Sequence, residues 1–125
     1  MKDGLKEINQ LAGVWGSFVS NNQGEVILGI TPPGLKKPEL ENIAQQALKL
    51  LVSSGGKITK VSEMVFHYSQ KKLFIVDLEQ AILAVICTPS VDIPLLRMTV
   101  NVVRTGWEGD EEVQLLLQKN YLERV

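Results

Sequence analysis

The sequence predicts a single α+β domain in which one antiparallel sheet packs against helices. The chain has 125 residues, about the length that one hydrophobic core organises, and 45% of them are apolar, enough to form that core. Strand-like runs follow one another through short turn-like connections, whereas helical periodicity fills separate stretches. The elements come in the order α-β-β-α-β-β-β-α, and one more helix follows at the C-terminus.

The N-terminal part of the chain predicts a short helix and then a β-hairpin. Apolar residues at three-residue spacing within Asp3–Ala12 indicate an amphipathic helix, which Gly13 ends. Two runs rich in β-formers follow, Val14–Ser20 and Glu25–Ile30. The connection Asn21–Gly24 contains Asn and Gly, which tolerate positive φ, so we expect the two runs to pair as a hairpin.

The longest helix is predicted over Pro38–Val52. Thr31–Gly34 ends the preceding strand, because its two prolines donate no backbone hydrogen bond and a glycine follows them. Pro38 suits the first helical turn, and the glycines of Ser53–Gly56 suit its end. Apolar residues recur at helical spacing and form one stripe: Leu40, Ile43, Ala44, Ala47, Leu48 and Leu51.

Three further runs predict a meander of strands. They are Met64–Ser69, Leu73–Leu78 and Ala81–Cys87, separated by short polar connections. Ala81–Cys87 is apolar at every position, so both of its faces must be covered and it belongs inside the sheet. Met64–Ser69 contains the polar residues His67 and Ser69, and we expect it at an edge.

Two helices are predicted at the end of the chain. Asp92 can cap the first, which ends near Arg104 and Gly106 and is apolar on most sides, so we expect other elements to cover it on both sides. The second opens with the acids Asp110–Glu112 and is too short to be stable alone. We expect it to dock on protein through one apolar face: Val113, Leu116, Leu117 and Tyr121. The predicted domains are residues 1–106 and a helical extension, 107–125.

Composition argues against several classes of function. Thirteen Lys and Arg against 14 Asp and Glu leave a formal charge of −1, which gives no positive field for nucleic acid. One cysteine and one histidine cannot build a Cys/His metal centre, so no metal is expected. The N-terminus is charged where a signal peptide is apolar, and no run is long enough to span a membrane. We expect a soluble, cytoplasmic protein.

No catalytic residue or cofactor site can be nominated, and we expect no enzyme. Gly55-Gly56-Lys57 resembles the end of a phosphate loop, but the earlier glycine and the following Ser or Thr are missing, so a helix end is the better interpretation. His67 has no positioned acid–base partner. Cys87 ends an apolar strand and is best interpreted as a small buried hydrophobe.

Three short motifs carry a resemblance to a known family. They are Leu11–Gly16, the Asn-Gly connection Asn21–Gly24 and the end of the meander at Leu83–Ile86. Together with the element order, they resemble the Roadblock/dynein light chain family over Lys2–Arg104. The resemblance implies a profilin-like fold, with a five-stranded antiparallel sheet between helices. It also implies a non-enzymatic homodimer that regulates or scaffolds a Ras-like small GTPase, or that serves as a dynein-associated adaptor.

The resemblance also implies which strand forms the dimer. Two sheets join through the strand after the long helix, here the residues Met64, Val65, Phe66, His67, Tyr68 and Ser69. This agrees with the edge position expected from the residues themselves, because an unpaired edge invites a partner strand. The matching strand is basic in dynein-type members and is not basic here. The departure favours a stand-alone prokaryotic GTPase regulator over a motor adaptor.

Three functions stay open on the sequence. In the first, the long helices lie side by side over the dimer, and their outward residues Glu41, Gln45 and Lys49 bind the GTPase. In the second, the protein is a motor or signalling-complex adaptor with no effect on GTP hydrolysis. In the third, it is a small-molecule sensor with a pocket between sheet and helices. Unchanged GTP turnover in a stable complex would select the second, and a retained ligand would select the third.

Overall fold

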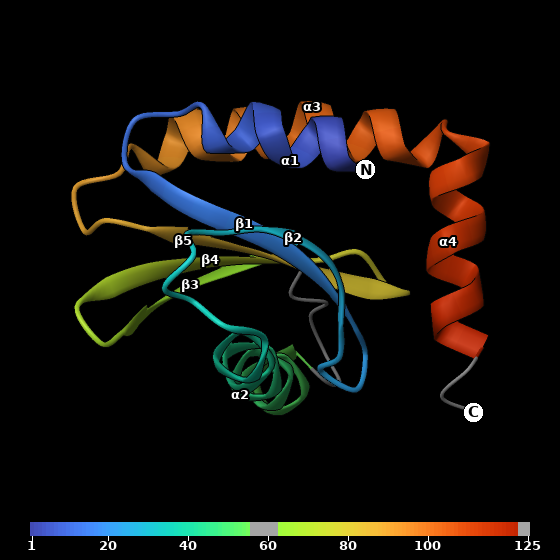
Figure 1. Cartoon of the computed structure of the whole chain (residues 1–125), viewed down its shortest axis with the longest axis horizontal. Helices are drawn as coiled ribbons and strands as arrows, with labels where there is room; N and C mark the ends of the chain where they lie inside the picture. The colour runs from blue at the N-terminus through green and yellow to red at the C-terminus, as the bar shows by residue number, and fades with distance from the viewer. Residues whose placement is uncertain (56–62, 123–125) are drawn as a thin grey trace.

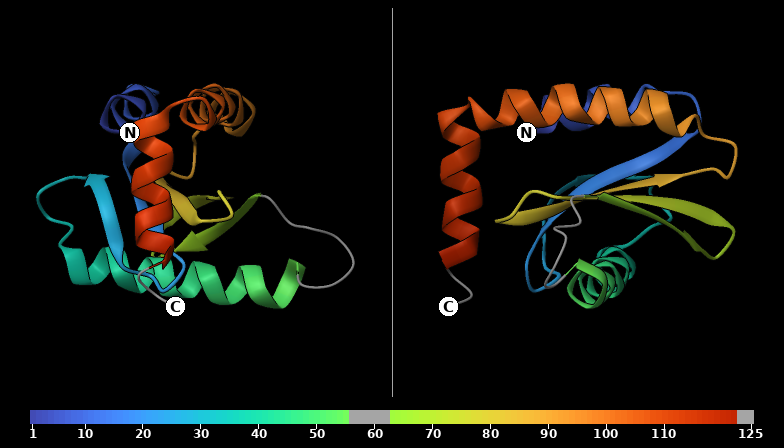
Figure 2. Two further views of the ribbon diagram at one scale, coloured as in Figure 1. Left: turned by 90° about the vertical axis from the view of Figure 1, so that its right-hand side faces the viewer. Right: turned by 180° about the vertical axis from the view of Figure 1, so that it is seen from behind.

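The polypeptide forms three layers, with helices on both faces of one antiparallel sheet (Figure 1). The computed structural model describes residues 1–55 and 63–122, with side chains for 1–51 and 63–120. Helices α1 (Lys2–Asn9) and α3 (Ile93–Glu108) lie side by side on one face, and α2 (Lys37–Gly55) crosses the other (Figures 1 and 2). The observed order of elements is the predicted one.

The sheet has five strands in the order β2-β1-β5-β4-β3, and every neighbouring pair is antiparallel. β5 lies in the middle and all its residues are buried, which confirms the prediction from its unbroken apolar run. β3 lies at an edge, as its polar residues predicted. The strands are β1 (Val14–Asn21), β2 (Val26–Ile30), β3 (Glu63–Tyr68), β4 (Lys71–Asp77) and β5 (Ala81–Cys87).

The sheet separates two hydrophobic cores. Successive residues of a strand point to opposite faces, so neighbouring residues of β4 enter different cores. Leu73 and Ile75 pack with the buried stripe of α2, whereas Phe74 and Val76 pack beneath α1 and α3. The predicted α2 stripe is confirmed: its first four residues are buried, and Leu48 and Leu51 are half-buried.

A close approach of α1 to α3 depends on a glycine. A Cβ atom on Gly4 would lie 2.6 Å from Val103 Cγ1 and 2.8 Å from Trp107 Nε1, closer than packed atoms allow. α1 ends at Asn9, earlier than predicted, and the chain turns before Gly13. Gly13 has φ +89°, a conformation that glycine adopts at little cost.

The end of α2 differs from the prediction. The segment Ser53–Gly55, expected to terminate the helix, lies within its last turn, and Gly56 lies outside the described residues. Ser and Gly weaken a helix by less than about 1 kcal/mol each, which the packed turns before them can outweigh. Local propensity therefore misplaced the boundary by one turn.

The predicted boundaries of α3 are right at the start and wrong at the end. Asp92 caps the helix, and its Oδ1 accepts a hydrogen bond of 3.0 Å from the backbone N–H of Leu95. The helix then continues through Gly106 to Glu108, and Gly109 follows it. The extra turn buries Trp107 against α1, a tertiary contact that outweighs the low helix propensity of Gly106.

The prediction that α3 is covered on both sides is also wrong. One face packs on the sheet and α1, but the outer face is open within the described part of the chain. Met98 and Val102 are each 66% exposed, and Leu95 is 46% exposed. Apolar composition alone did not reveal this, because a helix with many apolar residues can still leave some of them at the surface.

Helix α4 (Glu111–Leu122) turns away from α3 and runs past the end of the sheet (Figure 1). Val113 and Leu117 enter the core beneath α1 and α3, whereas Leu116, predicted on the same face, is 38% exposed. The side chain of Tyr121 lies outside the described residues. The predicted domain boundary after residue 106 falls inside α3, and the division itself stays a prediction.

Asp110 and Gln114 fix the bend between α3 and α4. Asp110 Oδ1 accepts hydrogen bonds from the backbone N–H groups of Glu112 (3.0 Å) and Val113 (3.3 Å), which caps α4. Gln114 Nε2 donates to the carbonyl of Trp107 at 2.8 Å. None of the helices the structure describes is both long and apolar enough to cross a membrane.

Candidate functional site

The outer strand β3 presents the residues that the sequence assigned to a dimer interface. Met64, Phe66 and Tyr68 pack against the core beneath α2, and Val65 and His67 point to the other face of the sheet and are exposed. Ser69 follows in the turn to β4 with φ +47°. All six predicted residues therefore lie together along one edge.

Side chains from opposite layers hold the two ends of β3. Arg97 Nε of α3 pairs with Glu63 Oε1 at 2.5 Å. On the other face, Asn42 Nδ2 of α2 donates a hydrogen bond of 3.2 Å to the Tyr68 hydroxyl. Both contacts use side chains only. Among the described residues, no side chain bonds to the backbone of β3, so its outer N–H and C=O groups can receive another strand.

The opposite edge, β2, is arranged differently. Glu41 Oε2 of α2 accepts a hydrogen bond of 3.2 Å from the backbone N–H of Val26. Asn9 Nδ2 of α1 donates to the carbonyl of Ile30 at 2.9 Å. Side chains from both helical layers thus occupy a backbone group at each end of β2, and they compete with an incoming strand.

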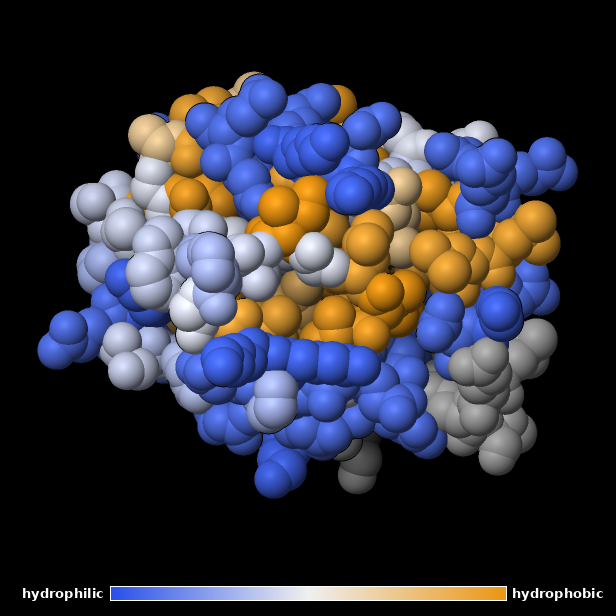
Figure 3. Space-filling model, viewed as in Figure 1, coloured by the Kyte–Doolittle hydropathy of each residue, from blue (hydrophilic) through white to orange (hydrophobic). Residues whose placement is uncertain are grey.

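The side chains of β2 form an apolar band between two hydrophilic helices (Figure 3). The band runs along the half-buried residues Val26, Ile27, Leu28 and Ile30. α1 borders it above and α2 below in this view. β2 is short, and side chains bond to one backbone group at each of its ends, so less of its hydrogen-bonding edge is open to another strand. The two edges of the sheet are therefore not equivalent, and β3 is the more open one.

The predicted partner-binding residues of α2 do not form one outward face. Glu41 is half-buried by its bond to Val26, and Gln45 Nε2 donates to the carbonyl of Gln23 at 2.6 Å. Both residues tie α2 to the β1–β2 hairpin, and only Lys49 is exposed at the outer surface without a bond to that hairpin. Residues four apart advance around a helix by about 40°, so the three residues spread from the hairpin side to the outside.

The hairpin contact could not be found from periodicity alone. Gln45 lies directly over Gly24, where a Cβ atom would meet its side-chain nitrogen at 2.6 Å. Gly24 also has φ +85°, so this position requires glycine on both counts. The sequence signal was the Asn-Gly turn, but it does not say which helix packs on that turn.

Cys87 is unsuited to nucleophilic chemistry. It lies fully buried at the end of β5, and burial raises the pKa of its thiol from 9.0 to about 11, while Lys72 acts in the opposite direction. A buried thiol that stays protonated is a weak nucleophile. Of the other candidates, His67 is exposed on β3, and Lys57 lies outside the described residues. The geometry of the described residues supports binding by surfaces.

Solved structures share this arrangement. A Roadblock/LC7 domain from Streptomyces avermitilis aligns with a TM-score of 0.73 at 16% identity, over 86% of this chain and 94% of the other. MglB in a tetrameric arrangement gives a TM-score of 0.71 at 12% identity, over 95% and 88% of the two chains. The gliding protein MglB from Thermus thermophilus gives 0.69 at 13% identity, over 94% and 88%.

The likeness is one of structure. The sequence matches no protein-family model and no curated protein. The chain has the Roadblock/LC7 fold, with the α+β order and five-stranded antiparallel sheet that the sequence predicted.

Proposed function

We propose that this protein is a non-catalytic homodimeric binding module that regulates or scaffolds a Ras-like small GTPase in the cytoplasm. One observation carries the proposal: a Roadblock-type sheet has one edge, β3, whose backbone is open, and another, β2, whose ends are bonded by side chains. The resemblance to Roadblock domains supplies the class of partner.

The dimer would form by antiparallel pairing of β3 with its copy. A two-fold axis through the paired strands joins two sheets into one and puts both α2 helices on the same face. α2 already contacts the β3 edge through Asn42 and Tyr68, so the two helices would approach each other across the axis. Val65 and His67 would lie on the opposite face, beside their symmetry mates.

The GTPase would bind the combined outer surface of the two α2 helices. Lys49 is exposed on this surface, and Glu41 and Gln45 lie at its border with the hairpin. The two-fold axis would place two copies of this α2 surface side by side. The larger combined surface favours a globular partner, because a stable interface needs about 800 Å² from each side. Exposed charges such as Lys49 would mainly set the rate and specificity of encounter.

A pull-down from the native organism, followed by a turnover assay, tests the proposal. Tagged protein should capture a GTP-binding protein, and light scattering of the protein alone should give twice the 13.9 kDa chain mass. GTP turnover by the captured protein is then measured with and without the dimer. A changed rate identifies a regulator, and an unchanged rate in a stable complex identifies a scaffold or adaptor. A concentration-independent monomer that captures no GTP-binding protein would refute the proposal.

A further inference from the structure

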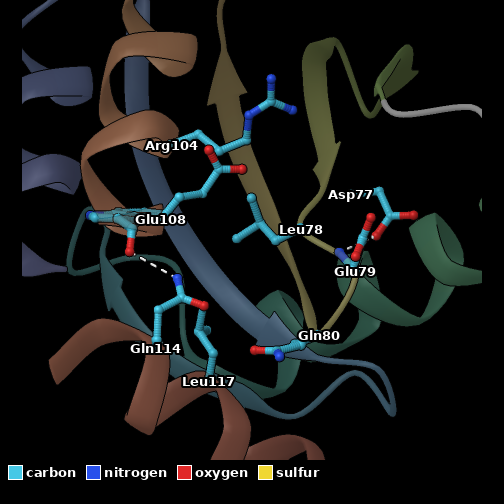
Figure 4. Close-up of a pocket in the computed structure, with 9 residues that line it drawn as sticks. Asp77, Leu78, Glu79, Gln80, Arg104, Glu108, Gln114 and Leu117 are labelled. Carbon is cyan, nitrogen blue, oxygen red and sulfur yellow. Dashed lines mark hydrogen bonds between the residues drawn. The ribbon is translucent and has the colours of Figure 1, made fainter. Parts of the chain in front are cut away.

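A pocket lies where the β4–β5 turn meets the bend between α3 and α4 (Figure 4). Its volume is about 330 Å³, near the lower limit of ligand pockets, which suits a single side chain or a small metabolite. The lining includes no residue of β3 or α2. An inference about it is therefore independent of GTPase binding.

The charged groups around the pocket are mostly acidic. Asp77 and Glu79 come from the turn, and Glu108 comes from the facing wall of α3 (Figure 4). Among the described residues of the lining, Arg104 is the single basic one, beside the acids Asp77 and Glu108. In the described part of the chain, Arg104 makes no ion pair. A cationic ligand is favoured over an anionic one.

The pocket also contains a buried hydrogen-bond acceptor without a donor. The side-chain oxygen of Gln80, Oε1, is shielded from solvent and has no partner in the described structure. Figure 4 shows the Gln80 amide at the base of the pocket, between the turn and α4. An unpaired buried acceptor is costly, and a donor that enters the pocket removes that cost.

The turn that carries these groups is held in place by its own hydrogen bonds. Asp77 Oδ1 accepts a hydrogen bond of 2.8 Å from the backbone N–H of Glu79, whose φ is +72°. The backbone N–H of Gln80 donates to the carbonyl of Leu78 at 2.9 Å. On the facing side, Gln114 is bonded to Trp107. The pocket is therefore formed before any ligand arrives.

Apolar groups complete the lining. Trp107 is 6% exposed, and Leu78 and Leu117 lie beside it in the pocket. These groups suit a short aliphatic stem. The required ligand thus has a cationic head rich in donors and an apolar stem.

We propose that this pocket binds an alkyl guanidinium group, either the side chain of an arginine in a partner protein or a small free guanidine. A guanidinium carries five N–H donors in one plane, enough to pair with a carboxylate and also reach Gln80 Oε1. A compact ammonium has three donors and cannot bind a carboxylate in a parallel, two-bond arrangement. Guanidinium chemistry therefore matches both the acids and the unpaired acceptor.

Fluorescence titration of the full chain tests this proposal. The chain has two tryptophans. Trp15 lies outside the pocket lining, near the start of β1, where Lys71 Nζ is 3.9 Å from its ring centre. A Trp15→Phe background leaves Trp107 as the reporter in the pocket. Nα-acetyl-arginine amide is the probe, and Nα-acetyl-citrulline amide is its uncharged analogue of nearly equal shape. We expect saturable binding of the arginine probe and at least tenfold weaker binding of the citrulline probe.

Matched variants locate the binding. Glu108→Gln removes an exposed acid of the pocket, and Glu111→Gln makes the same charge change on α4 outside it. We expect at least tenfold weaker binding for Glu108→Gln and for Gln80→Leu, no change for Glu111→Gln, and tighter binding for Arg104→Gln. Circular dichroism confirms that each variant is folded, and Glu108→Gln remains decisive if Gln80→Leu unfolds.

Three results would overturn the proposal. Equal affinity for the two probes would mean that charge is not recognised. Equal losses of affinity in Glu108→Gln and Glu111→Gln would mean that the probe responds only to the overall negative charge of the protein and not to this pocket. Weaker binding in Arg104→Gln would indicate an anion site. Agmatine and an Ala-Arg-Ala peptide then distinguish the sources: tighter binding of agmatine supports a free metabolite, and tighter binding of the peptide supports a partner's arginine.

Discussion

The carboxylate of Glu41 accepts a hydrogen bond of 3.2 Å from the backbone N–H of Val26, so α2 bonds directly to the outer strand of the sheet. Asn9 makes the corresponding contact from α1 to the carbonyl of Ile30. These two bonds occupy one backbone group at each end of an edge strand whose side chains are apolar, and they compete there with an incoming strand. No described side chain bonds to the backbone of β3 in this way.

Opening the β2 edge should destabilise the protein and promote association. Asn9→Ala and Glu41→Ala should each lower the free energy of unfolding by about 1 to 2 kcal/mol, because each leaves a backbone group without its partner. The double variant should form species larger than a dimer. Urea unfolding and light scattering measure the two effects, and Gln10→Ala, at the exposed residue that follows α1, is the control. Unchanged stability in both single variants would show that the β2 edge needs no closure.

A charge on β3 should disrupt the proposed dimer. Val65 is 40% exposed, and Val65→Lys would place like charges close together across the two-fold axis. We expect the dimer dissociation constant to rise at least tenfold, a change of about 1.4 kcal/mol. Val65→Thr keeps the β-branched shape without charge and should remain dimeric. Sedimentation over a concentration series measures both, and an intact dimer in Val65→Lys would exclude β3 as the interface.

Charge reversal on α2 should separate partner binding from stability. Lys49→Glu should weaken GTPase binding about tenfold and leave the melting temperature near normal, because the side chain is exposed. Glu41→Lys should instead lower the melting temperature, since Glu41 supports the hairpin. Lys6→Glu makes the same charge change on the opposite face and is the calorimetry control. Equal affinities for Lys49→Glu and Lys6→Glu would move the binding site away from α2.

The docking of α4 can be tested with two leucines of the same helix. Leu117 is buried and Leu115 is 64% exposed. Leu117→Ala should lower the free energy of unfolding by about 2 to 4 kcal/mol through lost burial and the cavity left behind, and Leu115→Ala should have little effect. Hydrogen exchange should also show faster opening of α4 in Leu117→Ala only. Similar effects of both substitutions would contradict the observed packing.

Stability should fall with pH through Cys87. Its pKa is 9.0 when exposed and about 11 in the folded protein, so between these values the unfolded chain releases the thiol proton and the folded protein keeps it. Stability is therefore full below pH 9 and declines above it, by about 1 kcal/mol at pH 10. Urea unfolding of wild type and Cys87→Ala at pH 8 and pH 10 isolates this effect. The stability advantage of the wild type should shrink by that amount, and a constant difference would contradict it.

The sequence by itself determined the elements and most of their order. Unbroken apolar character placed Ala81–Cys87 at the centre of the sheet, and helical spacing identified the buried stripe of α2. These properties are local: a strand buried on both faces or a helix with one buried stripe leaves a regular pattern in the chain. The cap at Asp92 and the positive φ of Gly24 were readable for the same reason.

Tertiary structure decided the ends of helices and the exposure of their faces. α3 continues through Gly106 because Trp107 packs against α1, and α1 can approach because Gly4 has no side chain. The same packing covers one face of α3 and leaves Met98 exposed, although the sequence predicted a covered helix. Neither contact has a periodic signature, since each joins residues about a hundred positions apart.

The candidate surfaces show the same division. The sequence identified β3 as an edge from its own polar residues, but it could not show that β2 is the closed edge. That closure joins Asn9 to Ile30 and Glu41 to Val26, and the pocket likewise joins Gln80 to Glu108 across two elements. The burial of a strand can be predicted from the pattern of apolar and polar residues along it. A hydrogen bond between distant segments depends on how the layers pack together, so only the folded chain shows it.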